Sequence, residues 1–158
     1  MMFATVGTRP DGFDRLIRQI DSIAVDFDEP IRAQIGAGEY VPEDIDWFRF
    51  TSEEEIHELY RTATVVIAHA GAGTLLTALS YGKPIVVLPR REQHGDHNDD
   101  HQTELANALS ERAEVFVVHE TSELRRAMRD ARSISVESGS ENNSLVRFLN
   151  DYIEDIDT

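Results

Sequence analysis

The run HAGAGT at positions 69–74 has the composition of a site that binds an anion. It follows a wholly apolar stretch at residues 65–68, and a helical pattern starts within it and continues to about Tyr81. Glycines let a ligand oxygen approach the backbone, and the unpaired N–H groups and dipole of a helix N-terminus attract phosphate. The spacing therefore predicts a phosphate-binding turn between a strand and a helix. The alternative is a tight turn whose glycines only allow close packing. A dinucleotide fingerprint fits poorly, because Leu76 stands where the third glycine is needed.

A second turn of this kind lies near the N-terminus. Gly7 and Thr8 end the apolar stretch at residues 2–6 and are expected at the same cleft, with a simple turn as the alternative. Arg9 follows and is either a partner for a pyrophosphate or one more surface arginine. The run GAG at positions 36–38 is predicted to be a turn only.

The segment HGDHNDDHQ at positions 94–102 is dense in side chains that bind metals or hydrogen-bond ligands. His97 and His101 are four residues apart and would share one face of a helix, so a metal site is one hypothesis. The segment lacks the fixed ligand set typical of zinc sites. The favoured interpretation is therefore a polar loop and helix start that hydrogen-bond a ligand such as a sugar, with no metal. His57 and His119 stand in no pattern.

No side chain stands in the pattern of a catalytic nucleophile. The chain has no cysteine and no G-x-S-x-G turn. Lys83 follows Gly82 but leads into Pro84, a strand start, so there is no Walker motif. The motifs therefore give no indication of covalent catalysis or of a bound cofactor.

Short apolar stretches alternate with helical patterns along the chain, which predicts a parallel sheet covered by helices on both faces. This is a Rossmann-like α/β fold, in which ligands bind at the carboxyl ends of the strands. Helices are expected to begin at Asp11, at Ser52 with Glu55 completing a capping box, and at Thr121; Gly82 is expected to follow the end of another. Strands are predicted at residues 2–6, 31–35, 46–50, 65–68, 84–88 and 115–118.

The 158 residues suit one compact domain, predicted at residues 1–132. Residues 133–143 are rich in Ser, Glu and Asn and are predicted to be a flexible linker. Residues 144–158 are predicted to form an amphipathic helix and an acidic tail.

The charge balance excludes some partners. The chain has 30 acidic and 15 basic residues, which gives a formal net charge of −15, and all but one of the basic residues are arginine. A nucleic acid or an anionic membrane surface would be repelled. An excess of acidic residues with almost no lysine is also typical of proteins adapted to high salt. With no cysteine, no signal peptide and no apolar run near the roughly 20 residues of a membrane helix, a cytoplasmic location is expected.

Four motifs in order carry a resemblance to a known family: FATVGT at 3–8, IAHAGAGT at 67–74, GKPIVVLP at 82–89 and HQTELA at 101–106. Over residues 2–120 the chain resembles the C-terminal, donor-binding domain of family 28 glycosyltransferases. It is similar to members in which this domain is a small separate subunit, as in the dolichol-linked UDP-N-acetylglucosamine transferase and bacterial exopolysaccharide and capsule enzymes.

The resemblance implies one half of a GT-B fold, whose C-terminal domain holds the nucleotide-sugar and whose N-terminal domain holds the acceptor. The chain begins at the donor domain's first strand, so the acceptor half is expected in a separate, membrane-anchored partner subunit. The chain itself would then lie peripheral to the membrane through that partner. A homodimer is a further expectation, because an unpartnered donor domain exposes an apolar interface.

The resemblance also implies roles for individual residues. His101, Gln102 and Glu104 would lie near the donor sugar, and Thr77 would bind the ribose or nucleoside where the family often has a glutamate. His69 is the candidate general base, with structural anchoring of the turn as the alternative. The donor diphosphate would bind at Gly7, Thr8, Gly71, Ala72, Gly73 and Thr74.

The implied activity is inverting transfer of a sugar from a UDP-sugar to a lipid-linked acceptor, without a metal. N-acetylglucosamine is among the candidate sugars. The alternative is a non-catalytic accessory subunit that binds a nucleotide-sugar and stabilises a partner glycosyltransferase.

Overall fold

The computed structural model describes residues 1–91 and 101–134, together with positions 147 and 151; for residues 101–103 it describes the backbone alone. The remainder of the predicted linker and final helix lies outside the described residues. Arg147 and Asp151 are helical and exposed. No helix among the described residues is long and apolar enough to cross a membrane.

The core of the domain is a six-stranded parallel sheet, as predicted. Its strand order is β3-β2-β1-β4-β5-β6. The chain therefore builds outward from β1 to β3, returns to pair β4 with β1, and continues in the other direction. The strands are β1 (Met2–Thr5), β2 (Ile31–Gln34), β3 (Asp46–Phe48), β4 (Val66–Ala68), β5 (Ile85–Val87) and β6 (Val115–Val117).

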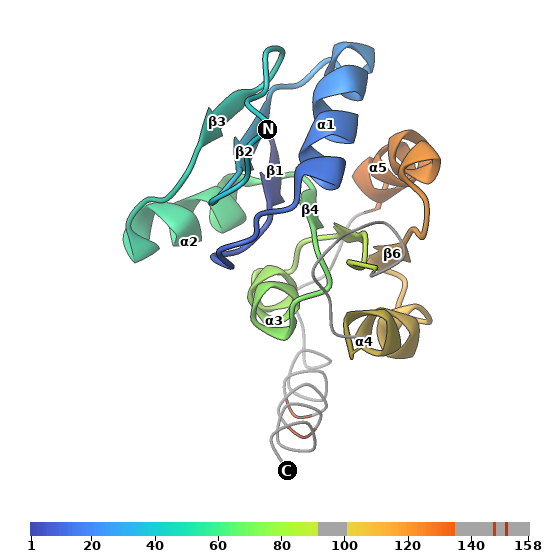
Figure 1. The fold of residues 1–158 in the computed structure, drawn as a ribbon. Helices are drawn as coiled ribbons and strands as arrows, with labels where there is room; N and C mark the ends of the chain where they lie inside the picture. The colour runs from blue at the N-terminus through green and yellow to red at the C-terminus, as the bar shows by residue number, and fades with distance from the viewer. Residues whose placement is uncertain (92–100, 135–146, 148–150, 152–158) are drawn as a thin grey trace.

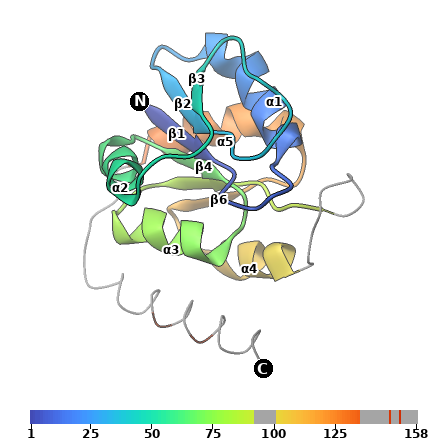
Figure 2. The same ribbon diagram turned by 60° about the vertical axis from the view of Figure 1, so that its left-hand side comes forward.

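Helices cover both faces of this sheet (Figures 1 and 2). On one face α1 (Asp14–Ile23) and α5 (Leu124–Arg132) pack on a core that includes Leu16, Ile20 and Met128. On the other face α2 (Glu53–Thr62), α3 (Ala72–Ser80) and α4 (His101–Leu109) contribute Tyr60, Leu75 and Leu105. Strands buried on both sides explain why residues of β4 and β5 are apolar at every position. The predicted Rossmann-like architecture is confirmed.

The ends of α2 and α3 follow the sequence prediction. Ser52 caps α2, since its hydroxyl accepts a hydrogen bond from the N–H of Glu55 at 3.2 Å. The Glu55 carboxylate accepts bonds from the Thr51 hydroxyl and from Arg32, where the predicted capping box has the N–H of Ser52, so only the Ser52 half of that box is confirmed. Gly82, which follows the C-terminal end of α3, has a φ of +68°. The N–H of Lys83 donates to the carbonyl of Ala78 at 3.1 Å, the 6→1 bond of a Schellman ending.

Two predicted helix caps are wrong. Helix α1 begins at Asp14 behind Phe13, with no side-chain cap. Asp11 pairs instead with two arginines, Arg9 and Arg90, whose charges compete for its carboxylate. Thr121 begins a 3₁₀ turn, η3 (Thr121–Glu123), which precedes α5. A second 3₁₀ turn, η1 (Ala24–Asp26), follows α1. The third strand ends at Phe48 rather than at residue 50.

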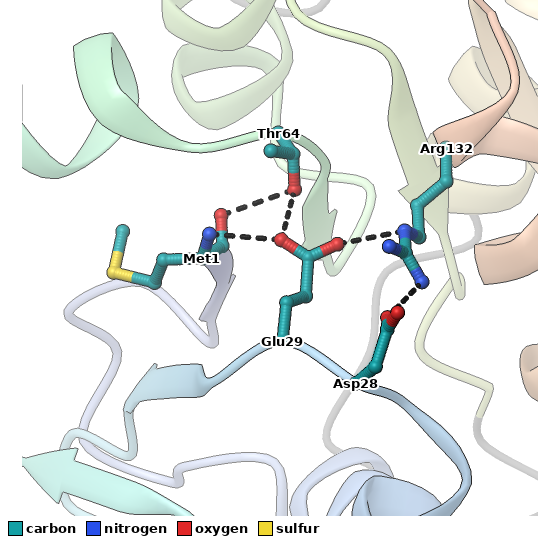
Figure 3. A network of polar contacts seen from close by, with 5 residues as sticks. All are labelled: Met1, Asp28, Glu29, Thr64 and Arg132. Atoms are coloured by element: carbon teal, nitrogen blue, oxygen red, sulfur yellow. Dashed lines mark hydrogen bonds and ion pairs between the residues drawn. The ribbon is translucent and has the colours of Figure 1, made fainter.

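A polar network lies at the amino-terminal ends of the strands (Figure 3). Its centre is Glu29, which pairs with the Met1 amino group and with Arg132, both at 2.8 Å. Glu29 also accepts a hydrogen bond from the Thr64 hydroxyl at 2.7 Å, and Arg132 also pairs with Asp28. The network ties α5 and the start of β4 to the segment before β2, at the end of the sheet opposite the functional site.

Candidate functional site

A cleft of about 360 Å³ opens at the carboxyl ends of β1 and β4. The strand order reverses between these two strands, so the segments that follow them diverge and leave a space, which is where open α/β sheets bind ligands. The cleft is lined by β1 and β2 ends, the β1–α1 loop, the turn before α3, and the facing sides of α2 and α3. The lining residues are Thr5, Gly7, Thr8, Arg9, Gln34, Ile56, His57, Tyr60, His69, Gly71, Gly73, Thr74 and Thr77.

The N-terminus of α3 forms one wall of the cleft. Gly71 is the N-cap residue and no side chain caps the helix. The first backbone bond runs from the N–H of Leu75 to the carbonyl of Gly71 at 3.0 Å, so the preceding N–H groups have no acceptor within the helix. A Cβ built on Gly73 would meet nothing within 4 Å. Gly73 therefore presents backbone N–H and open space to a ligand.

The other two glycines make room for a side chain of the protein. A Cβ on Gly7 would lie 2.8 Å from Nε2 of His69, and a Cβ on Gly71 would overlap the same imidazole at Cε1. Gly7 also has a φ of +74°, which favours glycine. The ring of His69 thus lies between the loop after β1 and the turn after β4, and it packs them together.

His69 is only 6% exposed. Its Nε2 lies 3.3 Å from Oγ1 of Thr74. Burial, together with the charges of Arg90 and Arg9, lowers the pKa of His69 to about 4. The imidazole is therefore neutral at pH 7 and a weak base. Its Nδ1 is buried and has no hydrogen-bond partner among the described residues, which leaves a polar atom for a ligand or water.

Polar bonds hold the strand ends beneath the cleft. Thr5 donates its hydroxyl proton to Oε1 of Gln34 at 2.7 Å and accepts a bond from the N–H of Gly7 at 3.1 Å. Arg9 lines the cleft with its side chain 41% exposed and pairs with Asp11 at 3.3 Å. Arg9 thus brings a positive charge to the wall opposite α3, in a chain whose net charge is strongly negative.

Helix α2 adds three lining residues that the sequence did not single out: Ile56, His57 and Tyr60. The only signal for Ile56 and Tyr60 was their place on the apolar face of the helix, and His57 had none. Nδ1 of His57 hydrogen-bonds the hydroxyl of Tyr81 at 2.8 Å. The Tyr60 ring stacks on that of Tyr81 with centroids 6.2 Å apart, so α2 is held against the flank of α3.

The predicted ligand-binding residues fall into two groups. Those of the diphosphate motif except Ala72 line one cleft, and Thr77 lies beside them on α3. The Thr77 hydroxyl donates to the carbonyl of Gly73 at 2.8 Å, so towards a ligand it can act only as an acceptor. Glu104 is exposed on the first turn of α4 and is absent from the cleft lining. The side chains of His101 and Gln102, and all of His97, lie outside the described residues.

No group of three His, Asp or Glu side chains within the described part of the chain is arranged to hold a metal ion. The helix N-terminus, the exposed Gly73 and Arg9 together suit an anionic ligand.

The model of the glycosyltransferase family 28 C-terminal domain matches residues 1–146. The chain belongs to glycosyltransferase family 28.

Two relatives of known name are consistent with membership of this family. The human UDP-N-acetylglucosamine transferase subunit ALG13 is 33% identical over 129 residues, which are 73% of this chain and 11% of the human protein. The subunit of the same name from Cryptococcus neoformans is 40% identical over 75 residues, 46% of this chain and 34% of that protein. The chain therefore spans about a tenth of the length of the human protein and a third of the fungal one.

Solved structures share the fold. A solution structure of ALG13 superposes with a TM-score of 0.63 at 18% identity, over 94% of both chains. The crystal structure of MurG from Acinetobacter baumannii gives a TM-score of 0.58 at 18% identity, over 94% of this chain and 49% of the other. These likenesses establish a GT-B-type fold, and the chain covers about half of the MurG chain.

Proposed function

We propose that this domain is the donor-binding, catalytic subunit of a two-component inverting glycosyltransferase. It moves a sugar, with N-acetylglucosamine favoured by the names of its relatives, from a UDP-sugar to a lipid-linked acceptor. The observation that carries the proposal is the cleft at the point of strand reversal, where an uncapped helix N-terminus and Gly73 face open space.

The diphosphate of the donor binds at this helix N-terminus. The N–H groups at the start of α3 offer donors to its oxygens, and the helix dipole favours its charge. Nδ1 of His69 is a further buried polar atom at the site, and Arg9 supplies a positive charge from the opposite loop. Binding that depends on backbone groups and one placed arginine is compatible with a net charge of −15, because bulk attraction is not needed.

The nucleoside lies further along the cleft, between α2 and α3. Ile56 offers an apolar contact there, and Thr77 offers an acceptor for a ribose hydroxyl. His57, held by Tyr81, lies on the same side. The donor sugar extends the other way, towards the start of α4, where His101, Gln102 and Glu104 are proposed to contact it.

The reaction is a direct displacement at the anomeric carbon. An acceptor hydroxyl oxygen forms the new bond as the bond to the UDP oxygen breaks, and the electron pair leaves with UDP. The first turn of α3 and Arg9 stabilise the charge that grows on the leaving diphosphate. A general base must take the proton of the acceptor hydroxyl. His69, with a pKa lowered to about 4, suits hydrogen bonding and anchoring better than this task, so we propose that the base comes from the partner subunit.

The partner is proposed to be a membrane-anchored subunit that holds the acceptor and brings this chain to the membrane surface from the cytoplasm. The human and fungal relatives are each named as a subunit of a transferase, which supports a partner. The domain at residues 1–132 would bind the donor, with the linker at 133–143 and the helix and tail at 144–158 beyond it. Whether the domain also forms a homodimer is tested by its mass in solution.

Calorimetry with UDP and UDP-N-acetylglucosamine tests donor binding. The informative variant is Gly73→Asp, which places a carboxylate in open space at the phosphate position. Its matched control is Ser80→Asp, which adds the same charge at the exposed far end of the same helix. We expect binding to be lost in Gly73→Asp and kept in the control. Absence of nucleotide binding by the unmodified protein would contradict the proposal.

Transfer in the presence of the partner separates a catalytic from an accessory role. The accessory alternative is favoured by one observation, namely that His69, the candidate general base, is buried and has a pKa lowered to about 4. Co-expression with the acceptor subunit and an assay of sugar transfer should show activity that Gln102→Ala and Gly73→Asp both reduce. A complex that stays fully active with both variants would show that this chain only stabilises its partner.

A further inference from the structure

Arg90 is the most deeply buried charged side chain among the described residues, with 1% of its surface exposed. It follows β5 and takes no part in lining the cleft. Burial of a guanidinium is costly unless its donors and charge are matched. Its partners therefore indicate what the structure gains from placing it there.

Arg90 contacts both ends of the loop between β1 and α1. One terminal nitrogen donates to the carbonyl of Val6 at 3.1 Å, and the other donates to the carbonyl of Gly12. The guanidinium also lies 3.9 Å from the carboxylate of Asp11 and 4.6 Å from the centroid of the Phe13 ring. One planar side chain thus joins residue 6, where the loop leaves the sheet, to residues 11–13, where it enters α1.

The residues between these two anchor points line the cleft. They include Gly7, Thr8 and Arg9, the wall that faces the N-terminus of α3. Gly7 packs on the His69 ring, so its position sets the position of that ring as well. Asp11 is shared between Arg90 and Arg9, and this link orients Arg9. A displacement of the loop would change every group on that wall together.

We propose that Arg90 is a positioning residue: it fixes the β1–α1 loop at both ends, so that Gly7, Thr8 and Arg9 stand opposite the α3 N-terminus in the geometry that a nucleoside diphosphate requires. The identity of the ligand in this proposal rests on the proposed function. Arg90 touches no ligand and acts through the loop. A planar guanidinium is needed because two carbonyls in different directions and one carboxylate must be met at once.

The test compares Arg90→Lys and Arg90→Met with Arg132→Met. The control removes an arginine that joins two chain segments by ion pairs at the opposite edge of the sheet, far from the cleft. Calorimetry measures the affinity for UDP, and urea unfolding confirms that each variant is folded. A loop that is correctly placed only a tenth of the time would weaken binding by about tenfold. We expect a loss of at least this order in both Arg90 variants and a change within about twofold in the control.

NMR supplies a readout that needs no ligand. The amide signals of Gly7, Thr8 and Arg9 should shift in both Arg90 variants and stay in place in Arg132→Met. Lysine keeps the charge but cannot meet both carbonyls, so Arg90→Lys should leave the titration of His69 closer to that of the unmodified protein than Arg90→Met does. The proposal is overturned if Arg90→Lys binds UDP normally with unshifted loop amides, or if all three variants weaken binding equally. If the unmodified protein binds no UDP, the proposed function fails, and the amide signals still decide the role of Arg90.

Discussion

The imidazole of His69 occupies the space that a side chain at Gly71 would need. A Cβ at position 71 would overlap Cε1 of the ring and lie 2.9 Å from its Nδ1. The ring has little room to move, because Gly7 packs against it at Nε2 and only 6% of the residue's surface is exposed. Two glycines that in the sequence indicate ligand binding are thus required by a buried histidine, and only Gly73 faces open space.

Alanine at these positions should have opposite effects. Gly71→Ala forces the buried ring to move and should cost about 1–3 kcal/mol of the free energy of unfolding. Gly73→Ala meets no atom and should leave stability unchanged or raise it by up to about 1 kcal/mol, because alanine favours the helix. Urea unfolding of the two variants provides the measurement. Equal stability of the two would show that the His69 ring does not restrict position 71.

His69 should make stability fall as the solution is acidified below pH 6.5. Its pKa is about 4 in the folded protein and 6.5 for the free group, so between these values the unfolded chain takes up a proton that the folded chain does not. The contribution of the neutral His69 to the free energy of unfolding is complete above pH 6.5 and decreases as the pH falls to about 4. Its size is about 3 kcal/mol. Urea unfolding from pH 7.5 to 4.5, compared with His69→Asn, should show a steeper loss in the unmodified protein; parallel curves would contradict a buried neutral imidazole.

The network around Glu29 should respond to a lower pH window. Burial acts to raise the pKa of Glu29, but hydrogen bonds from the amino terminus and Thr64 and the charge of Arg132 outweigh it and lower the pKa. Its contribution is therefore present above about pH 4.5 and is lost as pH falls further. At pH 7, Glu29→Gln should lower the free energy of unfolding by about 2 kcal/mol. Asp28→Asn is the control: Asp28 binds the same arginine but is 83% exposed, so its loss should cost much less stability than Glu29→Gln. Equal effects of the two variants would rule out a central role for Glu29.

Salt should stabilise the domain. Thirty acidic residues and 15 basic ones leave a net charge of −15, so the acidic side chains repel one another in the compact state. Salt weakens this repulsion, because the screening length falls to about 3 Å at 1 M salt. The thermal midpoint in 2 M potassium chloride should exceed the midpoint at low salt. Differential scanning fluorimetry across a salt series measures it. A falling midpoint would mean that ion pairs such as those of Arg132 outweigh the repulsion.

Local patterns determined the architecture. Apolar stretches of a few residues, each followed by a helical pattern, were enough to predict a parallel sheet covered on both sides, because a strand buried on both faces must be apolar throughout. The cap at Ser52 and the helix end at Gly82 were also readable, since each depends on residues within four positions. The HAGAGT run marked a turn that lines the cleft for the same reason, and four ordered motifs indicated the family.

Contacts between distant segments were decided only in the tertiary structure. Asp11 has the side chain of a helix cap, yet Arg90, 79 positions away, competes for its carboxylate. His57 stands in no sequence pattern, and it reaches the cleft because α2 packs on α3 through Tyr60 and Tyr81. Residue types and spacing determined which turns join the strands to the helices at this end of the sheet. The packing of β1 beside β4 determined which side chains line the cleft, because burial and long-range charge depend on neighbours that the chain brings together only when it folds.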